Sequence, residues 1–128
     1  MHWQDEETIS AIQQALNDQD SLVRLAAVQA LAMVGAPQVI QPLFQTAEGD
    51  PEENIRAHAL LAIEWVLQAR SYEEESKTIF PAPGAVRTRG PHRKAEILVA
   101  LDRIGNSDRS PYVRFLARGA YKRLARLA

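Results

Sequence analysis

Asp20-Ser-Leu-Val-Arg-Leu-Ala-Ala-Val-Gln-Ala-Leu-Ala-Met-Val-Gly35 carries a residue pattern that returns twice along the chain and indicates the fold class. An acidic residue comes first, then a Val-Arg pair, then two small residues and two apolar ones. These positions are Asp20, Val23, Arg24, Ala27, Ala30, Leu31 and Val34. Small and apolar residues at this spacing fall along the side of a helix that packs against its neighbours.

Two further copies of the pattern follow. The second begins at Asp50 and places Ile55-Arg56 at the Val-Arg position, a shift of 32 residues. The third begins at Asp108 and places Val113-Arg114 there, a further 58 residues along. Self-similarity with a period in the thirties is typical of helical repeat arrays, in which each repeat is a helix pair stacked on the next.

The pattern predicts an all-α fold, a short α-solenoid or α-α superhelix of three helix pairs. We expect one domain over 1–128, with repeats at about 5–35, 37–70 and 92–128. Gly35 is expected to end a helix in the left-handed conformation, and Pro42 to bend the helix that follows. The helical pattern stops near Arg70, so a long insertion loop is expected over 71–90, before the third repeat.

Val23-Arg24, Ala27, Ala30-Leu31 and the turn Val34-Gly-Ala-Pro37 resemble HEAT-like repeats, in particular the subtype named for phycobilisome lyases. The third copy departs from that pattern, with Gly119 inside its helix and no proline turn after it. The resemblance implies the stacked fold. It also implies one functional alternative, an accessory role in the attachment or removal of phycobilin, and relatives serve as scaffolds or contact nucleic acid. Fold alone does not select among these functions.

Composition excludes several classes of protein. No apolar run approaches the roughly 18 residues that span a bilayer, so no contact with the membrane interior is expected. The acidic N-terminus does not resemble a secretory signal, and with no cysteine the chain forms neither disulfides nor thiolate sites. We therefore expect a cytoplasmic protein.

The chain offers few groups for chemistry. Its three histidines, His2, His58 and His92, have no spacing that would bring two of them to one metal, and Glu73-Glu74-Glu75 is expected to be a solvated acidic run. No phosphate-binding loop or nucleophile motif is present. We predict no catalytic residue, no metal site and no cofactor, and hence a protein that is not an enzyme.

The arginine of each copy is predicted to tie one repeat to the next. Arg24, Arg56 and Arg114 recur with the fold, each near an aspartate. The aspartates are Asp20, Asp50 and Asp108. A guanidinium forms charge-assisted hydrogen bonds to a carboxylate, so we expect a ladder of such bonds along a buried edge of the stack.

The second helix of each pair is expected to line the concave face of the solenoid. At 100° per residue, one side of these helices is apolar in the first two repeats. The residues predicted to face outward, as candidates for binding a partner, are Leu25, Val28, Leu60, Leu61 and Trp65. Either the insertion, through Ile79, Phe80 and Val86, or another protein chain would cover this strip, and that chain could be a second copy in a homodimer.

The same side of the third repeat is basic. Its candidate partner-binding residues are Phe115, Arg118, Lys122 and Arg126. The charge along the chain is polarised, because residues 1–75 hold 13 acidic and three basic residues, and residues 76–128 hold three and 12. The basic strip could meet an acidic protein surface or, as the less favoured alternative, nucleic acid. We therefore predict a protein interaction or scaffold module.

Overall fold

The computed structural model describes residues 6–78 and 94–126, and the structural statements below concern these residues. All the regular elements in these ranges are helices, which confirms the all-α prediction. They are α1 (Glu6–Ala15), α2 (Ser21–Val34), the 3-10 helix η1 (Pro37–Val39), α3 (Ile40–Gly49), α4 (Glu53–Thr78), α5 (Lys94–Ser107) and α6 (Pro111–Ala125). Among the described residues no helix is both long enough and apolar enough to span a membrane.

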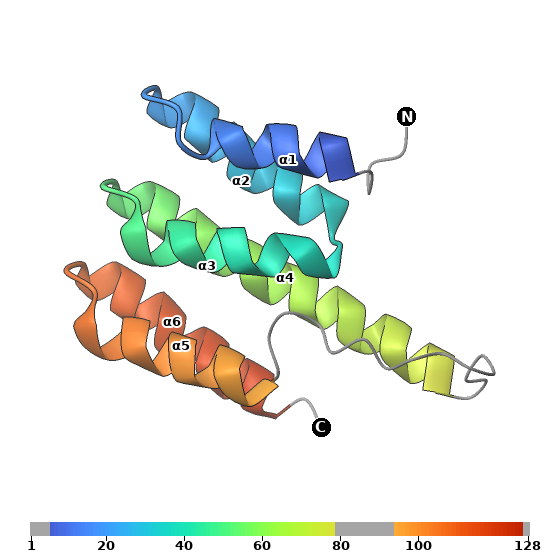
Figure 1. Ribbon diagram of the computed structural model, residues 1–128. Coiled ribbons are helices and arrows are strands. Elements are labelled where there is room, and N and C mark those ends of the chain that lie inside the picture. The colour runs from blue at the N-terminus through green and yellow to red at the C-terminus, as the bar shows by residue number, and fades with distance from the viewer. Residues whose placement is uncertain (1–5, 79–93, 127–128) are drawn as a thin grey trace.

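The helices form three antiparallel pairs stacked in chain order (Figure 1). α1 packs on α2, α3 on α4, and α5 on α6. The inner helices α2, α4 and α6 also pack directly on one another, more extensively than the outer helices α1, α3 and α5 do. The short α-solenoid predicted from the sequence is therefore confirmed, and its closer packing on the inner side bends such a stack towards the inner helices.

Local sequence explains where the helices begin and end. The Asp20 carboxylate accepts the Leu22 N–H at 2.9 Å and caps α2, and the Ser110 hydroxyl accepts the Val113 N–H at 3.2 Å and caps α6. Gly35 ends α2 in the left-handed conformation, with φ at +66°, and its N–H bonds the Leu31 carbonyl. The prediction for Gly35 is confirmed.

Two helix boundaries differ from the sequence prediction. The third helix divides into η1 and α3, so Pro42 falls in the first turn of α3, where a missing amide hydrogen costs nothing. α4 continues past Arg70 to Thr78, because no proline or glycine interrupts the sequence before Pro81, and its end projects beyond the stack in Figure 1. The remainder of the predicted insertion, including Phe80, lies outside the described residues.

Small residues allow the helices of the stack to approach one another closely. Ala27, Ala59 and Ala117, which occupy the same position in the three repeats, are all buried. A Cβ on Gly105 of α5 would come within 3.0 Å of the Arg118 side chain of α6, so the helices of the third pair are also in close contact there. The core is one continuous apolar cluster that runs through all three pairs.

Candidate protein-binding surfaces

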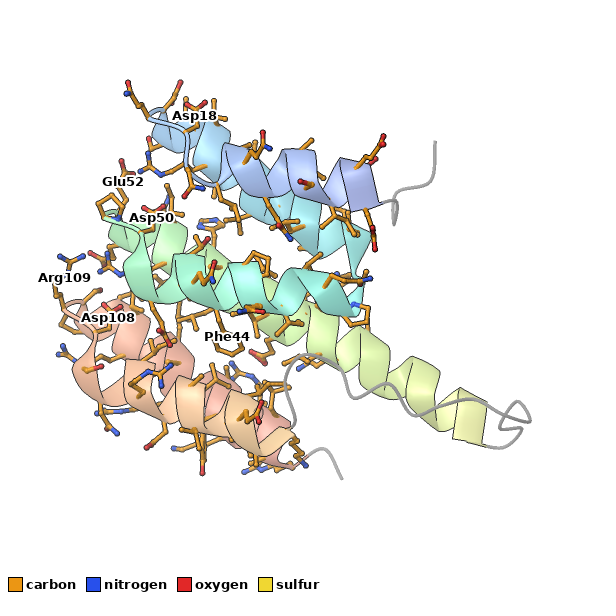
Figure 2. All side chains as sticks on the ribbon, in the orientation of Figure 1. Asp18, Phe44, Asp50, Glu52, Asp108 and Arg109 are labelled. Atoms are coloured by element: carbon orange, nitrogen blue, oxygen red, sulfur yellow. The ribbon has the colours of Figure 1, made fainter. Side chains whose placement is uncertain are left out.

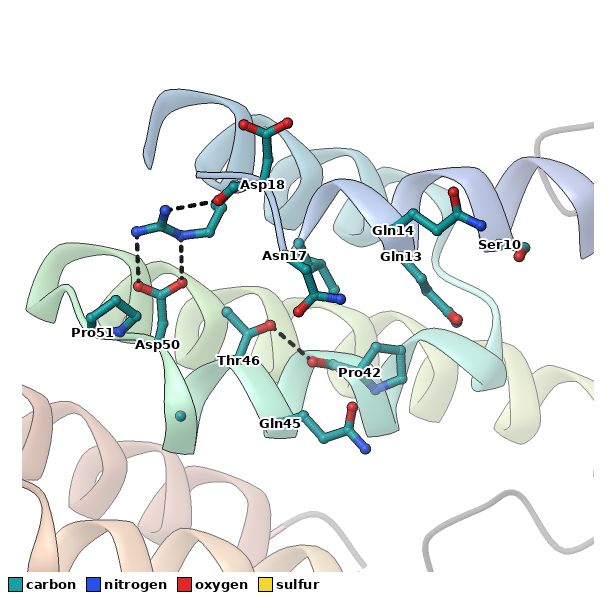
Figure 3. Close-up of a pocket in the computed structure, with 13 residues that line it drawn as sticks. Ser10, Gln13, Gln14, Asn17, Asp18, Pro42, Gln45, Thr46, Asp50 and Pro51 are labelled. Atoms are coloured by element: carbon teal, nitrogen blue, oxygen red, sulfur yellow. Dashed lines mark hydrogen bonds and ion pairs between the residues drawn. The ribbon is translucent and has the colours of Figure 1, made fainter. Parts of the chain in front are cut away.

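An arginine joins the first pair to the second. Arg24 of α2 donates from Nε to Asp50 Oδ2 at 3.0 Å and from Nη1 to the Asp18 carbonyl at 2.9 Å (Figure 3). Asp50 lies in the turn between α3 and α4, and its Oδ1 also accepts the Glu52 N–H at 2.9 Å. Arg24 thus holds the turn of its own repeat and the carboxylate of the next repeat at once.

The second pair is joined to the third in the same way. Arg56 donates from Nε and Nη2 to the two Asp108 carboxylate oxygens, at 3.0 and 3.1 Å, and from Nη1 to the Asp50 carbonyl at 2.9 Å. Asp108 also accepts the Ser110 N–H at 2.8 Å. The predicted ladder between repeats is therefore present, and these two arginines serve the packing of the stack.

The first aspartate of the ladder is Asp18, not Asp20 as predicted. Asp18 accepts the Asp20 N–H at 2.8 Å, the local geometry that Asp50 and Asp108 repeat, and the three aspartates lie one above another at the same end of the pairs (Figure 2). The 32-residue shift that aligns Arg24 with Arg56 also aligns Asp18 with Asp50, so the sequence contained this signal, and the prediction took Asp20 because it is the aspartate nearer to Arg24. Asp20 is left to cap α2.

The ladder shifts the pKa of its groups. Burial alone would raise the pKa of Asp108, but the hydrogen bonds from Arg56 and from the Ser110 amide outweigh it and hold that pKa below its ordinary value. The hydrogen bond to Asp50 raises the pKa of Arg24, against the effect of burial.

This shift predicts a loss of stability in acid. Asp108 binds its proton less readily in the folded chain than in the unfolded chain. Its contribution to the free energy of unfolding is therefore complete above the unfolded pKa of about 3.9, and it disappears as the pH falls through the lower folded pKa. Chemical denaturation of the wild type and of Asp108→Asn at a series of pH values measures it. We expect the stability difference between them to be largest above about pH 4 and to shrink below. A difference that does not change with pH would contradict this assignment.

The apolar strip predicted along the second helices is only partly exposed. Val28 and Leu60 are each 1% exposed and belong to the core, so these two were wrong as exposed candidates, and Leu25 is partly buried against the core. They lie on the side of α2 and α4 that carries the ladder arginines, and that side packs on the next pair. We call this side of each inner helix the inter-repeat stripe: 24, 25, 28, 31 and 32 in α2, with 56, 57, 60, 63 and 64 in α4.

The exposed apolar residues of the inner helices lie on the neighbouring side of each helix. Three of them follow the stripe positions 32, 60 and 64 by one residue. Met33 is 77% exposed, Trp65 66% and Leu61 47%, and Leu22 and Tyr112 are exposed as well. We call these five residues the inner face. Leu61 and Trp65 were predicted to be exposed, and they are. Leu22 and Met33 were missed, although Met33 holds the repeat position of Trp65, a signal that the sequence already contained.

On α6 the inter-repeat stripe is open. Its residues Phe115, Arg118, Tyr121 and Lys122 are exposed, whereas the α4 residues at the same repeat positions are buried. We call these four residues, with Arg114, the end face. Arg126, at the end of α6, is exposed too, as predicted. The neighbouring Arg123 instead donates to the buried Glu64 of α4, at 2.8 Å from Nη2 to Oε1, so it belongs to the contact between repeats.

A groove of about 660 Å³ lies between the first two pairs, with walls contributed by α1 and α3 (Figure 3). Four amide side chains contribute to its lining: Gln13, Gln14, Asn17 and Gln45. The charged pair at its end, Arg24 and Asp50, is already engaged in the ladder. Asp18 also lines the groove, and its carboxylate accepts the Asp20 N–H. The groove therefore offers polar groups for recognition.

The described residues hold no cluster of three or more His, Cys, Asp or Glu side chains that could bind a metal ion. His58 is only partly buried, and its Nδ1 is 2.7 Å from the Asn54 carbonyl of the preceding turn. This hydrogen bond gives Nδ1 of the ring a partner within its own helix. His2 and His92 lie outside the described residues.

The model of one protein family, HEAT repeats, matches residues 2–64, just under half of the chain. The match covers the first two helix pairs up to the middle of α4 and supports the HEAT-like resemblance, without support for the phycobilisome-lyase subtype in particular. HEAT repeats generally mediate protein–protein interaction. No curated protein and no solved structure matches this chain.

Proposed function

We propose that this chain, a HEAT-like repeat protein, is a non-enzymatic module that binds a protein partner through its inner face. The observation that carries the proposal is the exposure of Met33, Leu61 and Trp65 on adjacent inner helices. Met33 and Trp65 hold the same repeat position on α2 and α4, and packed helices lie about 8–10 Å apart. Their side chains can therefore form one apolar surface.

The chemistry of these side chains suits a protein interface. A large aromatic residue and methionine are enriched at such interfaces, and tryptophan is among the residues whose loss costs most binding energy. Protein interaction sites are often apolar surfaces surrounded by polar residues. Exposed polar groups on the same two helices come from Gln29, Asn54 and Gln68. We expect an amphipathic segment of the partner to lie across α2 and α4.

Site-directed photocrosslinking tests the inner face. A photoreactive residue at position 33 or 65 is expected to capture the same partner, and one at Asp102, exposed on the outer helix α5, is expected to capture none. Trp65→Ser should weaken binding of that partner by about 30-fold or more, as for a central aromatic residue. Asp102→Ser is the matched control and should bind as the wild type does. Capture from position 102 alone, or undiminished binding by Trp65→Ser, would refute the proposal.

Nucleic-acid binding through α6 is the second candidate. It is favoured by exposed Arg118, Lys122 and Arg126 on the helix that also exposes Phe115, since phosphates and stacked bases are bound by such groups. It predicts an affinity that falls steeply with salt, is lost in Arg118→Glu and is unchanged in Trp65→Ser. The role in bilin attachment rests on sequence resemblance alone.

A further inference from the structure

Each end of the stack carries one of the two partners of a ladder contact, an arginine at one end and an aspartate at the other. Arg114 of α6 repeats the position of Arg24 and Arg56, and its Nη1 bonds the Asp108 carbonyl at 2.6 Å, as those arginines bond the carbonyl of their own turn. Among the described residues, no carboxylate lies within ion-pair distance of Arg114. Its Nε and Nη2, which in the other two repeats reach the next aspartate, have no such partner there.

Asp18, at the other end of the stack, is the complementary carboxylate. Its carboxylate accepts the Asp20 N–H, as Asp50 and Asp108 accept the N–H two residues on. Asp50 and Asp108 each also bind the arginine of the preceding repeat, and their side chains are 3% and 6% exposed. Asp18 is exposed, and within 6–78 and 94–126 no arginine side chain bonds its carboxylate.

Apolar residues on the same two end surfaces as Arg114 and Asp18 are also exposed. On α6, Phe115 and Tyr121 are exposed where Ala57 and Ile63 of α4 are buried by the following pair. On α2, Val23 is 37% exposed, whereas Ile55, at the same repeat position on α4, which has a pair on either side, is buried. The open surfaces at the two ends are therefore the two sides of the contact that is made twice within the chain.

The charges of the two end pairs are complementary as well. The first pair, over 6–34, has four acidic residues and one basic residue, and the third pair, over 94–126, has three acidic and eight basic residues. A net charge of −3 therefore faces one of +5. Such opposite surfaces attract one another and oppose stacking of like ends.

We propose that the chain assembles head to tail, with the end face of one copy packed on the first helix pair of a second copy. Arg114 of one copy then donates to the Asp18 carboxylate of the next and continues the ladder, while Phe115 and Tyr121 pack against the side of α2 that carries Val23. Because the two surfaces differ, the contact is heterologous and propagates into a filament or a ring rather than a two-fold dimer. The inner face takes no part in it.

Analytical ultracentrifugation of the full chain tests this assembly through charge reversal. The wild type is expected to form species larger than a monomer as its concentration rises, and less so at high salt. Arg114→Glu and Asp18→Arg, each alone, should weaken association by roughly tenfold to a hundredfold, the range for a charge-assisted hydrogen-bonded pair. An equal mixture of the two variants should associate again, because Arg114 of one variant meets Asp18 of the other, and the introduced carboxylate meets the introduced guanidinium.

Circular dichroism of each single variant establishes that the helices are intact, and recovery in the mixture would itself require folded chains. Trp65→Ser is the matched control and should associate as the wild type does, so failure of the inner-face proposal and of this one are distinguishable. A wild type that remains a monomer at all concentrations overturns the proposal. So does association that survives in Arg114→Glu, or single variants that stay monomeric when mixed.

Discussion

Replacing Arg56 with alanine is expected to lower the free energy of unfolding by about 3 kcal/mol, the usual result of removing one member of a buried ion pair. The whole residue is only 3% exposed, and its guanidinium bonds both oxygens of Asp108 and the Asp50 carbonyl. Without it, the Asp108 carboxylate stays buried between repeats with only the Ser110 amide to satisfy it. Urea denaturation followed by circular dichroism measures the change.

Arg114→Ala is the matched control for that experiment. Arg114 has the same repeat position and the same bond to the carbonyl of its own turn, but it joins no carboxylate among the described residues. Its replacement at low protein concentration should therefore cost about 1 kcal/mol, the net value of one hydrogen bond. Equal losses in the two variants would show that the arginine stabilises its own turn and that the contact between repeats contributes nothing.

The neighbouring leucines of α4 are expected to respond very differently to alanine. Leu60 is fully buried in the inter-repeat stripe, so Leu60→Ala removes core volume and should cost about 2–5 kcal/mol. Leu61 is on the inner face and about half exposed, so Leu61→Ala should cost about 1 kcal/mol or less. Both variants keep a good helix former at the site, which makes denaturation midpoints directly comparable.

The comparison also separates stability from binding. We expect Leu60→Ala to weaken the fold, and Leu61→Ala to weaken capture of a partner at the inner face while the fold is kept. A Leu61→Ala variant as unstable as Leu60→Ala would contradict the division between the inner face and the inter-repeat stripe. The same division makes Leu60→Asp unsuitable as a test of binding, because a charge there would enter the core.

Sequence reasoning predicted the fold because the repeat pattern is a property of the stack itself. Val-Arg and the small residues recur wherever one helix pair meets the next, so Arg24 and Arg56 could be assigned to a ladder before any coordinates were known. Gly35 could be assigned as a helix end because only glycine readily takes its conformation. These features are local or periodic, and either kind can be recognised in a sequence.

The surfaces were harder to predict because an inner helix of a solenoid is buried on several sides. A simple amphipathic helix has one apolar face, and that picture placed Val28 and Leu60 outside. In the stack these residues pack on the following pair, and only a narrow strip through Met33 and Trp65 remains free. At the same repeat position Ala57 is buried in α4 and Phe115 is exposed in α6, so the presence of a following pair, which helix periodicity does not show, determines whether the stripe is core or surface.

Hydroxyl-radical footprinting of the dilute chain, with the unfolded chain as reference, tests the division of the inner helices most directly. It reads the solvent access of single side chains by mass spectrometry. We predict strong protection of Val28, Leu31 and Leu60, and rapid labelling of Met33, Trp65 and Phe115. Labelling of Leu31 and Leu60 as fast as in the unfolded chain would mean that the pairs do not stack through this stripe, and both proposed surfaces would lose their basis.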